Sequence, residues 1–453
     1  MSPAPAAGPA AAPAAAPDAA PVAAPGSDSR ARAAEPLRAA LPVALYVHVP
    51  FCVSHCPYCD FVLVAGRETR GPANRLAAFV AALEVELALR ADALDARWGP
   101  PEEIAGLGEA PTLRPRLDSL YLGGGTPSLL PAATIAGLIA LVRDRYGLAR
   151  DAEITLEVNP GADERGDASA LRDAGVTRLS IGAQSLDTAE LRALGRRHSP
   201  RDVGETVGAA RSAGIPSISL DLLYDLPGAS VAGWARTLES ALDLEPDHLS
   251  LYALTLDDPD ADGLTGAGGD HLPIRPGARR WRARARPGQD DDRAAAMYEL
   301  ADRRLARAGF DWYEISNWAR PGRRSRHNLA YWQGAAWEAV GPGAHAFDGV
   351  DRRWNAARLD AYLAALQPGD GTAPRLPPGG VHLGDPAGRA SEAAILALRT
   401  SSGLPAAALD GPPFGPSLAW AIDARLLEQT ETERLVLTRA GRLLSNELFL
   451  RLV

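Results

Sequence analysis

Six runs of aliphatic, β-branched and aromatic residues alternate with helical segments, and this alternation constrains the fold of the 453-residue chain most strongly. The expected strands span 43–49, 118–124, 153–159, 177–182, 216–224 and 247–254. Segments between them, such as 74–90 and 201–214, repeat apolar residues every three or four positions, as amphipathic helices do. Strands that alternate with helices pair in parallel through right-handed crossovers. We therefore predict an α/β fold, a partial TIM-like (βα)6 barrel over 41–260.

The regular alternation ends after residue 260. The expected order from there is an Arg-rich loop insertion (261–290), an extension of the barrel (291–367), a Pro/Gly-rich linker (368–389) and a small, mainly helical C-terminal domain (390–453) with a hairpin at 435–444. The insertion holds the one basic run, "RPGARRWRARARPG", which we interpret as a solvated loop. The alternative interpretation is a docking patch for an anionic partner or a membrane surface.

Composition, net charge and cysteine placement argue against several classes of protein. Residues 1–40 are rich in Ala and Pro and have no basic residue before Arg30, so we expect a disordered tail rather than a signal peptide. No stretch approaches the ~18 apolar residues of a membrane span. The formal charge of −9 argues against nucleic acid as a partner. Clustered rather than scattered cysteines are typical of a reducing compartment, so we expect a cytoplasmic protein.

All three cysteines of the chain lie in the nine residues "FCVSHCPYC", directly after the first expected strand. Thiolates at Cys52, Cys56 and Cys59 are close enough along a loop to converge on one soft metal centre. Three thiolates on a cubane cluster leave one iron without a protein ligand, which a small molecule with amino and carboxylate groups can chelate. The alternatives are three buried thiols, or a zinc site completed by His48 or His55.

The motifs, in their residues and their order along the chain, resemble those of the radical S-adenosylmethionine (SAM) superfamily, and within it those of the HemN/HemW group. The cysteine spacing, with Tyr58 before the last cysteine, is the superfamily signature. The motifs that carry the closer resemblance, most of all to the HemW group of haem chaperones, are "YVHVPFCVSHCPYCDF", "YLGGGTPSLL", "LEVNPG", "RLSIGAQS", "LGRRHS", "LLYDLPG", "YEISNWARPG", "HNLAYW" and "VGPGAH". They run in this order between residues 46 and 345, and the match in the C-terminal domain is weaker.

This resemblance implies a [4Fe–4S] cluster on the three cysteines and SAM beside it. The implied SAM contacts are Tyr46, Gly124, Gly125, Thr126, Glu157, Gln184, Arg196, Asp221 and the backbone of Ala253. Their positions suit this role, because barrel enzymes gather their chemistry at the C-terminal ends of the strands. Two glycines let a ligand approach the backbone, an arginine pairs with a carboxylate, and an aspartate accepts from ribose hydroxyls. Each also has a plain alternative, namely a turn, a surface arginine and a satisfied polar group in the barrel.

The resemblance also implies haem as cargo. An HNxxY motif associated with haem binding stands at His327–Tyr331, and an imidazole is a reasonable axial ligand for haem iron. The alternatives are a His/Asn loop that is satisfied by its own backbone, or haem binding elsewhere, for instance through His345.

One position separates the subgroups of the family. The coproporphyrinogen dehydrogenases carry a fourth cysteine two positions after the third, where this chain has Phe61. The implied function is therefore a haem chaperone that delivers haem to apo-haemoproteins, with respiratory and membrane-associated proteins among the candidates. Whether it is also an enzyme stays open, but we expect no coproporphyrinogen III oxidase activity. The alternatives are an oxygen-independent coproporphyrinogen III dehydrogenase, which decarboxylates propionates by radical chemistry, and a radical enzyme with another substrate.

Overall fold

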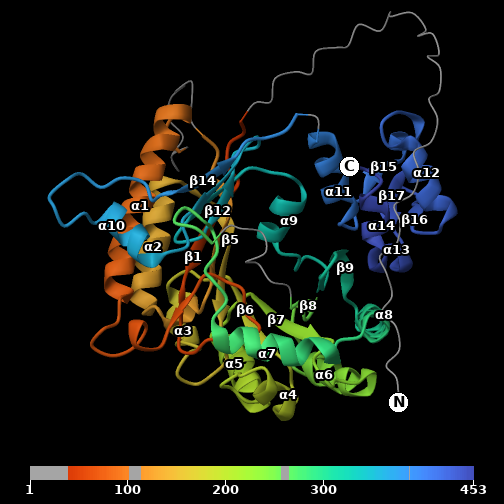
Figure 1. The fold of residues 1–453 in the computed structure, drawn as a ribbon, viewed down its shortest axis with the longest axis horizontal. Helices are drawn as coiled ribbons and strands as arrows, with labels where there is room; N and C mark the ends of the chain where they lie inside the picture. Colours follow the sequence, from red (N-terminus) through yellow and green to blue (C-terminus); the bar gives the residue numbers. More distant parts are fainter. Residues whose placement is uncertain (1–38, 102–113, 257–264, 387) are drawn as a thin grey trace, which may run out of the picture. The chain divides into compact units, whose positions relative to one another are not determined.

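Six parallel strands form the centre of a twelve-stranded sheet, as predicted (Figure 1). The computed structural model describes residues 39–101, 114–256, 265–386 and 388–453, so the expected tail lies outside it except for residues 39 and 40. The six strands, in their order across the sheet, are β1 (Ala44–Val49), β4 (Leu117–Gly124), β5 (Leu148–Val158), β6 (Arg178–Gln184), β7 (Ser217–Tyr224) and β8 (His248–Ala253). Each pairs in parallel with the next. Their C-terminal ends therefore meet at one edge of the sheet.

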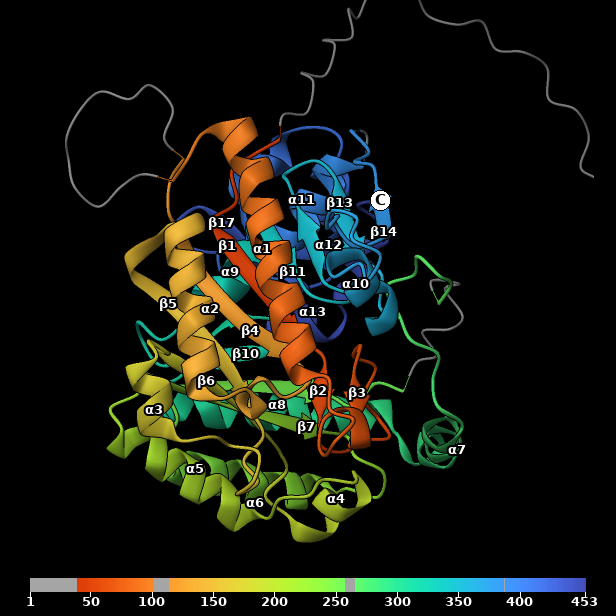
Figure 2. The same ribbon diagram turned by 90° about the vertical axis from the view of Figure 1, so that its left-hand side faces the viewer.

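Helices follow the strands and bury the apolar side chains of the sheet. They are α1 (Leu76–Trp98), α2 (Ala132–Arg145), α3 (Ala168–Asp173), α4 (Thr188–Ala193), α5 (Pro200–Ser212) and α6 (Val231–Asp243). Figure 2 shows α1 and α2 side by side over β1, β4 and β5. Local sequence fixes where several of them begin. Helix α5, for example, starts with a capping box in which Ser199 and Asp202 satisfy each other's backbone N–H groups.

Strands from the region 291–367 and beyond extend this sheet on both sides. Next to β1 lie β11 (Trp337–Val340), β12 (His345–Phe347), β13 (Arg352–Asn355) and β14 (Gly379–His382), while β10 (Asn317–Ala319) and β9 (Asp311–Glu314) follow β8. Helices α8 (Asp291–Arg307), α9 (Arg326–Trp332) and α10 (Leu359–Leu366) belong to the same region. Strand β14 falls within 368–389, so that segment is more than a linker, because its backbone pairs with β13.

The Arg-rich run is a helix rather than a solvated loop, which corrects the prediction for this segment. Helix α7 (Pro276–Ala285) begins with a proline at its first turn and buries Ala278, Arg282 and Ala285 along one face. The Arg282 guanidinium donates to the carbonyl oxygens of Pro57 and Tyr58, at 3.3 and 3.1 Å. It also pairs with the Asp60 carboxylate. The arginine-rich helix is therefore fixed to the cysteine loop. Residues 261–264 of the expected insertion lie outside the described residues.

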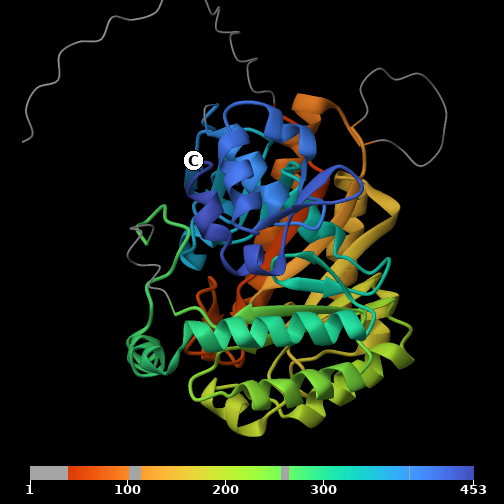
Figure 3. The ribbon, with the colours of Figure 1, turned by 90° about the vertical axis from the view of Figure 1, so that its right-hand side faces the viewer.

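The C-terminal region, blue in Figure 3, is a compact group of short helices and strands. It has a hydrophobic core of its own. It contains α11 (Arg389–Leu398), α12 (Gly415–Asp423), α13 (Arg439–Leu443) and α14 (Ser445–Phe449), with a small antiparallel sheet of β15 (Leu404–Pro405), β17 (Arg434–Leu437) and β16 (Leu427–Gln429). The hairpin expected at 435–444 is wrong. Strand β17 pairs with the preceding β16, because Thr438 caps α13 through the N–H of Gly441 and ends the strand. No helix in the described segments is long and apolar enough to cross a membrane.

Candidate cofactor site

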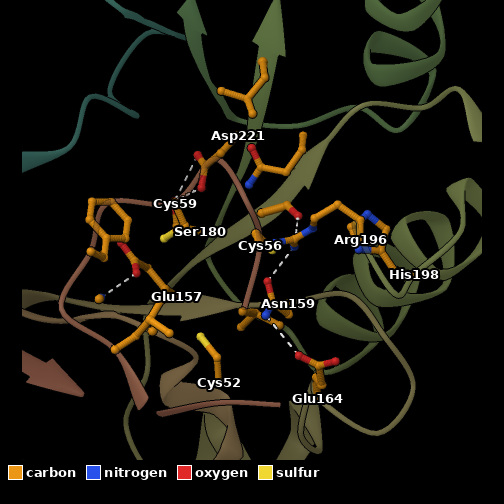
Figure 4. A pocket seen from close by; sticks show the side chains of 18 of the residues that line it. Cys52, Cys56, Cys59, Glu157, Asn159, Glu164, Ser180, Arg196, His198 and Asp221 are labelled. Carbon is orange, nitrogen blue, oxygen red and sulfur yellow. Dashed lines mark hydrogen bonds between the residues drawn. The ribbon is translucent and has the colours of Figure 1, made fainter. Parts of the chain in front are cut away.

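One cavity of about 390 Å³ lies at the C-terminal ends of the central strands and collects most of the predicted site residues (Figure 4). Those that line it are Cys52, Cys56, Cys59, Gly124, Gly125, Glu157, Gln184, Arg196 and Asp221. They come from the cysteine loop, from β4 to β7 and the residue after β4, and, for Arg196, from the segment that follows α4. Residues more than 160 positions apart in sequence therefore meet in one pocket, as the strand-end rule predicts.

The cysteine loop follows the short strand β2 (Phe51–Cys52), which pairs with β3 (Val64–Ala65). The N–H of Cys59 donates to the carbonyl oxygen of Cys56 at 3.1 Å, which closes the turn between them. Burial raises the pKa of the Cys52 thiol to about 11 and that of Cys59 to about 12. These thiols are therefore protonated near neutral pH, and a metal centre that binds thiolates has to displace their protons.

The three cysteine side chains do not converge on one point in this structure. In the described segments no three His, Cys, Asp or Glu side chains are gathered closely enough to hold one metal ion. The three cysteines instead stand apart around the pocket wall (Figure 4). His48, one candidate for a fourth zinc ligand, has both ring nitrogens hydrogen-bonded, to Tyr46 Oη at 3.0 Å and to the carbonyl oxygen of Val62 at 2.7 Å.

Packing within the protein leaves no room for a side chain at the last residue of β4, Gly124, or at the next residue, Gly125. A Cβ atom built on Gly124 would lie 2.4 Å from the His48 ring, and the φ of Gly124 is +108°. A Cβ on Gly125 would lie 2.7 Å from the carbonyl oxygen of Phe51, which is backbone of the cysteine loop. Both glycines line the pocket, so the close approach of a ligand to their backbone stays a prediction beside this packing reason. These glycines let the cysteine loop lie directly on β4.

Two carboxylates with different surroundings face the pocket. Glu157 accepts from the hydroxyl of Tyr121 at 2.9 Å and from the N–H of Gly124 at 2.8 Å. Burial raises its pKa to about 7, in spite of these two bonds. Asp221 accepts from Ser180 Oγ at 2.9 Å, and burial raises its pKa as well. Near neutral pH the pocket can therefore exchange protons with what it binds.

Arg196 provides a fixed positive charge beside the cysteines. Its Nη2 donates to Asn159 Oδ1 at 2.6 Å and to the carbonyl oxygen of Gly182 at 2.8 Å, and its Nη1 donates to Cys56 Sγ at 3.6 Å. Its Nε is buried and has no hydrogen-bond partner among the residues that the structure describes. A buried N–H without an acceptor is costly, so an incoming carboxylate would satisfy it. This orphaned donor fits the carboxylate of SAM.

The structure adds residues that the sequence reasoning missed. Asn159 ties the site together, because its amide donates to Thr126 Oγ1 at 2.8 Å and to Glu164 at 3.0 Å while its oxygen accepts from Arg196. Asn159 directly follows β5, in the motif "LEVNPG". A search for polar residues at the C-terminal ends of the expected strands could therefore have found it. Tyr252 and Asn328 also line the pocket. Asn328 belongs to α9, far along the chain, and no local pattern links it to this site.

Three predicted SAM contacts do not line the pocket. Thr126 is buried behind the wall, where its hydroxyl donates to Cys52 Sγ at 3.4 Å. Tyr46 lies deeper in the barrel, with its ring centroid 6.0 Å from that of Tyr121. Ala253 is exposed at the end of β8. The first two support side chains of the wall. The role of Ala253 stays a prediction.

His327 and Tyr331 do not line the pocket, although the ring of Tyr121, which does, packs on His327 with centroids 5.0 Å apart. His327 is 1% exposed, and its nitrogens are hydrogen-bonded to Ser119 Oγ at 2.9 Å and to Tyr331 Oη at 2.7 Å. Burial lowers its pKa to about 3, so the ring is neutral. In this conformation His327 offers no free nitrogen to iron. Axial ligation would require breaking the bond to Tyr331 and exposing the ring. His345, the alternative, is half-exposed and pairs with Asp270 at 2.7 Å.

Phe61, at the position that separates the subgroups, lines the pocket with its side chain 62% exposed. An aromatic ring here supplies apolar surface and no thiolate. The described pocket is therefore lined by three cysteines and has an aromatic ring at Phe61.

Comparisons with known proteins agree with this geometry. A family model described as the radical SAM superfamily matches residues 46–241. The protein named "Heme chaperone HemW" of Mycobacterium tuberculosis (strain H37Rv) is 36% identical over 405 residues, which cover 89% of this chain and 93% of the relative. The protein of the same name from Escherichia coli is 33% identical over 67% of this chain and 70% of its own length. The solved coproporphyrinogen III oxidase (HemN) from Escherichia coli superposes with a TM-score of 0.69 over 93% of this chain and 91% of that one, at 22% identity, and shows the same fold.

Proposed function

Since this chain belongs to the HemW family of the radical SAM superfamily, we propose that it is a cytoplasmic haem chaperone, which binds haem and delivers it to apo-haemoproteins. The observation that carries the proposal is similarity to a named haem chaperone over nearly the whole length of both chains. Phe61 supports it at the level of the site, because the extra cysteine of the dehydrogenases is missing there.

The pocket residues suit the cofactors of the family. Cys52, Cys56 and Cys59 would hold a [4Fe–4S] cluster, and Arg196 with Asp221 would hold the carboxylate and ribose of SAM. When bound, the cluster supplies a one-electron centre with an iron open to SAM. The side chains of the protein neutralise charge in the pocket and hold its backbone groups in place. Arg196 balances negative charge beside Cys56, and Glu157 fixes the backbone N–H of Gly124 at the pocket wall.

His327 and Tyr331 contribute to haem binding under this proposal. Because His327 is buried and hydrogen-bonded to Tyr331, it can bind haem iron only after a conformational change. If α9 opens, the neutral imidazole becomes available to iron. The alternative is that the pair shapes neighbouring side chains that contact haem. His345, which is half-exposed, is the comparison histidine for testing these two roles of His327 and Tyr331.

A haem titration of anaerobically reconstituted protein tests the function. We expect wild type to bind about one haem per chain, because haem is held as discrete cargo rather than on general apolar surface. His327→Ala is expected to weaken binding or shift the Soret band, with His345→Ala as its comparison, and to leave iron and sulfide content unchanged. Failure of wild type to bind haem would refute the proposal. In parallel, conversion of coproporphyrinogen III to protoporphyrinogen IX over several turnovers would favour the dehydrogenase.

A further inference from the structure

A second cavity of about 320 Å³ lies between α1 and the extension strands, away from the cysteines. We call it the outer groove. Its wall includes the apolar and aromatic side chains Leu94, Trp98, Trp337, Phe347 and Val381. A concave and mostly apolar pocket with a few polar groups is the usual form of a small-molecule site.

Arg353, one of three arginines in the wall of the outer groove with Arg90 and Arg97, has an unused donor. Arg353 donates from Nη2 to the carbonyl oxygen of Ala339 at 3.0 Å and pairs with Glu338. Its Nη1 is buried and finds no acceptor in the part of the chain that the structure describes. An anionic oxygen that reached this nitrogen would satisfy the donor.

The other acidic groups of the wall are already compensated. Asp348 pairs with Arg97 at 3.4 Å and accepts from the N–H groups of Val350 and Asp351 at 2.9 and 2.8 Å. Asp351 accepts from the N–H of Gly384 at 2.8 Å. The carboxylates of the wall therefore have partners, while one guanidinium N–H lacks one, so an anionic edge of a ligand is favoured over a cationic edge.

A continuous series of ring contacts connects the outer groove to the HNxxY residues. The ring of Phe347 packs on Trp337 with centroids 5.2 Å apart, Trp337 on Tyr331 at 4.6 Å, and Tyr331 on His327 at 5.0 Å. His327 in turn packs on Tyr121 at 5.0 Å, and Tyr121 lines the cysteine pocket. Such separations are those of favourable aromatic pairs. His327 and Tyr331 therefore lie directly behind the wall of the outer groove.

We propose that the outer groove binds the porphyrin ring of haem, with a propionate carboxylate directed to Arg353. This deepens the proposed haem-chaperone function and rests on it. A porphyrin combines a flat apolar ring with two carboxylates, which are the two features that the groove complements. The residues lining the described groove include no histidine, cysteine or methionine, so the ring is held there without an axial ligand. The HNxxY side chains then act on haem through Trp337, on which Tyr331 packs, which is the second of the two roles considered for them above, and not as ligands of the iron.

Two exposed residues of the same edge give a matched pair of variants. Val381 lines the groove and is 58% exposed, while Leu383, two residues on, is 72% exposed and does not line it. We expect Val381→Glu to weaken haem binding by about tenfold or more, since it places an unpaired charge against the ring, and Leu383→Glu to change it by no more than about twofold. Metal-free protoporphyrin IX is expected to bind about as tightly as haem and to displace it, because no iron ligand is involved.

The role of Arg353 is tested with haem whose propionates are esterified. We expect wild type to bind haem dimethyl ester more weakly than haem, and Arg353→Met to bind the two equally. Equal haem affinity in wild type and Val381→Glu, or failure of protoporphyrin IX to displace haem, would overturn the assignment of the groove while leaving haem binding in place. No haem binding by wild type would instead refute the proposed function.

Discussion

Two glycines at the end of β4 determine where the cysteine loop lies. Gly124 faces the ring of His48, and Gly125 faces the backbone of Phe51, directly before Cys52. Neither position has room for a Cβ atom unless backbone or a buried ring moves. The three cysteines thus depend on residues that do not contact a metal, through the packing of one loop on one strand.

Gly125→Ala is expected to destabilise the protein by about 1–3 kcal/mol, because its methyl group would overlap the Phe51 backbone. The displaced loop should also retain less iron after reconstitution. Gly137→Ala is the matched control. It lies within α2, where a Cβ meets nothing within 4 Å, and should stabilise by about 0.5–1 kcal/mol. Thermal unfolding and iron content measure both effects, and equal behaviour of the two variants would contradict this account.

The carboxyl of Glu157 should make stability depend on pH. Burial raises its pKa from 4.5 to about 7 in the folded protein, so the folded state binds this proton more tightly than the unfolded chain does. The resulting stabilisation is fully present below pH 4.5 and is lost as the pH rises through about 7. Glu157→Gln should remove this part of the profile and raise relative stability at alkaline pH. Denaturant unfolding of the cluster-free protein at several pH values measures it.

Glu205 provides the contrasting variant. Its pKa is lowered by hydrogen bonds from Arg165 and Arg201, so its carboxylate stabilises the fold above the usual pKa and loses this contribution as the pH falls. Glu205→Gln should therefore flatten the profile only at acid pH and lower relative stability at neutral pH. If Glu157→Gln left the profile between pH 4.5 and 7 unchanged, Glu157 would titrate normally and its burial would not control its charge.

Helix α7 shows how one element fixes another. Its inner arginine, Arg282, is 5% exposed and binds two carbonyl oxygens between Cys56 and Cys59. Trp281, next to it, donates to the carbonyl oxygen of Ala193 at 3.1 Å. The helix therefore joins the cysteine loop to the end of α4.

Arg282→Ala should loosen the cysteine loop, because it removes the donors that hold the backbone between Cys56 and Cys59. We expect faster proteolysis within 53–60 and faster loss of iron from the reconstituted protein. Arg280→Ala, an exposed arginine of the same helix, is the control and should match wild type. Identical iron loss in the two variants would mean that α7 does not stabilise the loop.

Across the whole molecule, the sequence predicted the centre of the fold better than its margins. The six parallel strands are confirmed in order, since each is a short run of mostly buried residues and helices separate them along the chain. Strand β14 escaped prediction because "GGVH" is too glycine-rich to indicate a strand, and only pairing with β13 makes it one. Helix α7 escaped because its many arginines suggested a solvated loop, while one of them is buried against the cysteine loop.

The candidate site shows the same division. The three cysteines, Glu157 and Asp221 follow from strand ends, because the carboxyl ends of parallel strands must meet. The sequence did not reveal which side chains from distant segments pack against each other. The stacking of His327 among Tyr121 and Tyr331, and the burial of both its nitrogens, depend on where α9 packs.

Transfer of haem to an acceptor tests the central claim most directly. Protein loaded with one equivalent of haem is mixed with an apo-haemoprotein, such as apomyoglobin, and the acceptor's absorbance spectrum is followed over time. The account predicts that haem moves to the acceptor faster than it leaves a protein that only adsorbs it, such as serum albumin at the same concentration. Transfer no faster than from albumin, together with multiple turnovers of coproporphyrinogen III in the presence of SAM and a reductant, would contradict it.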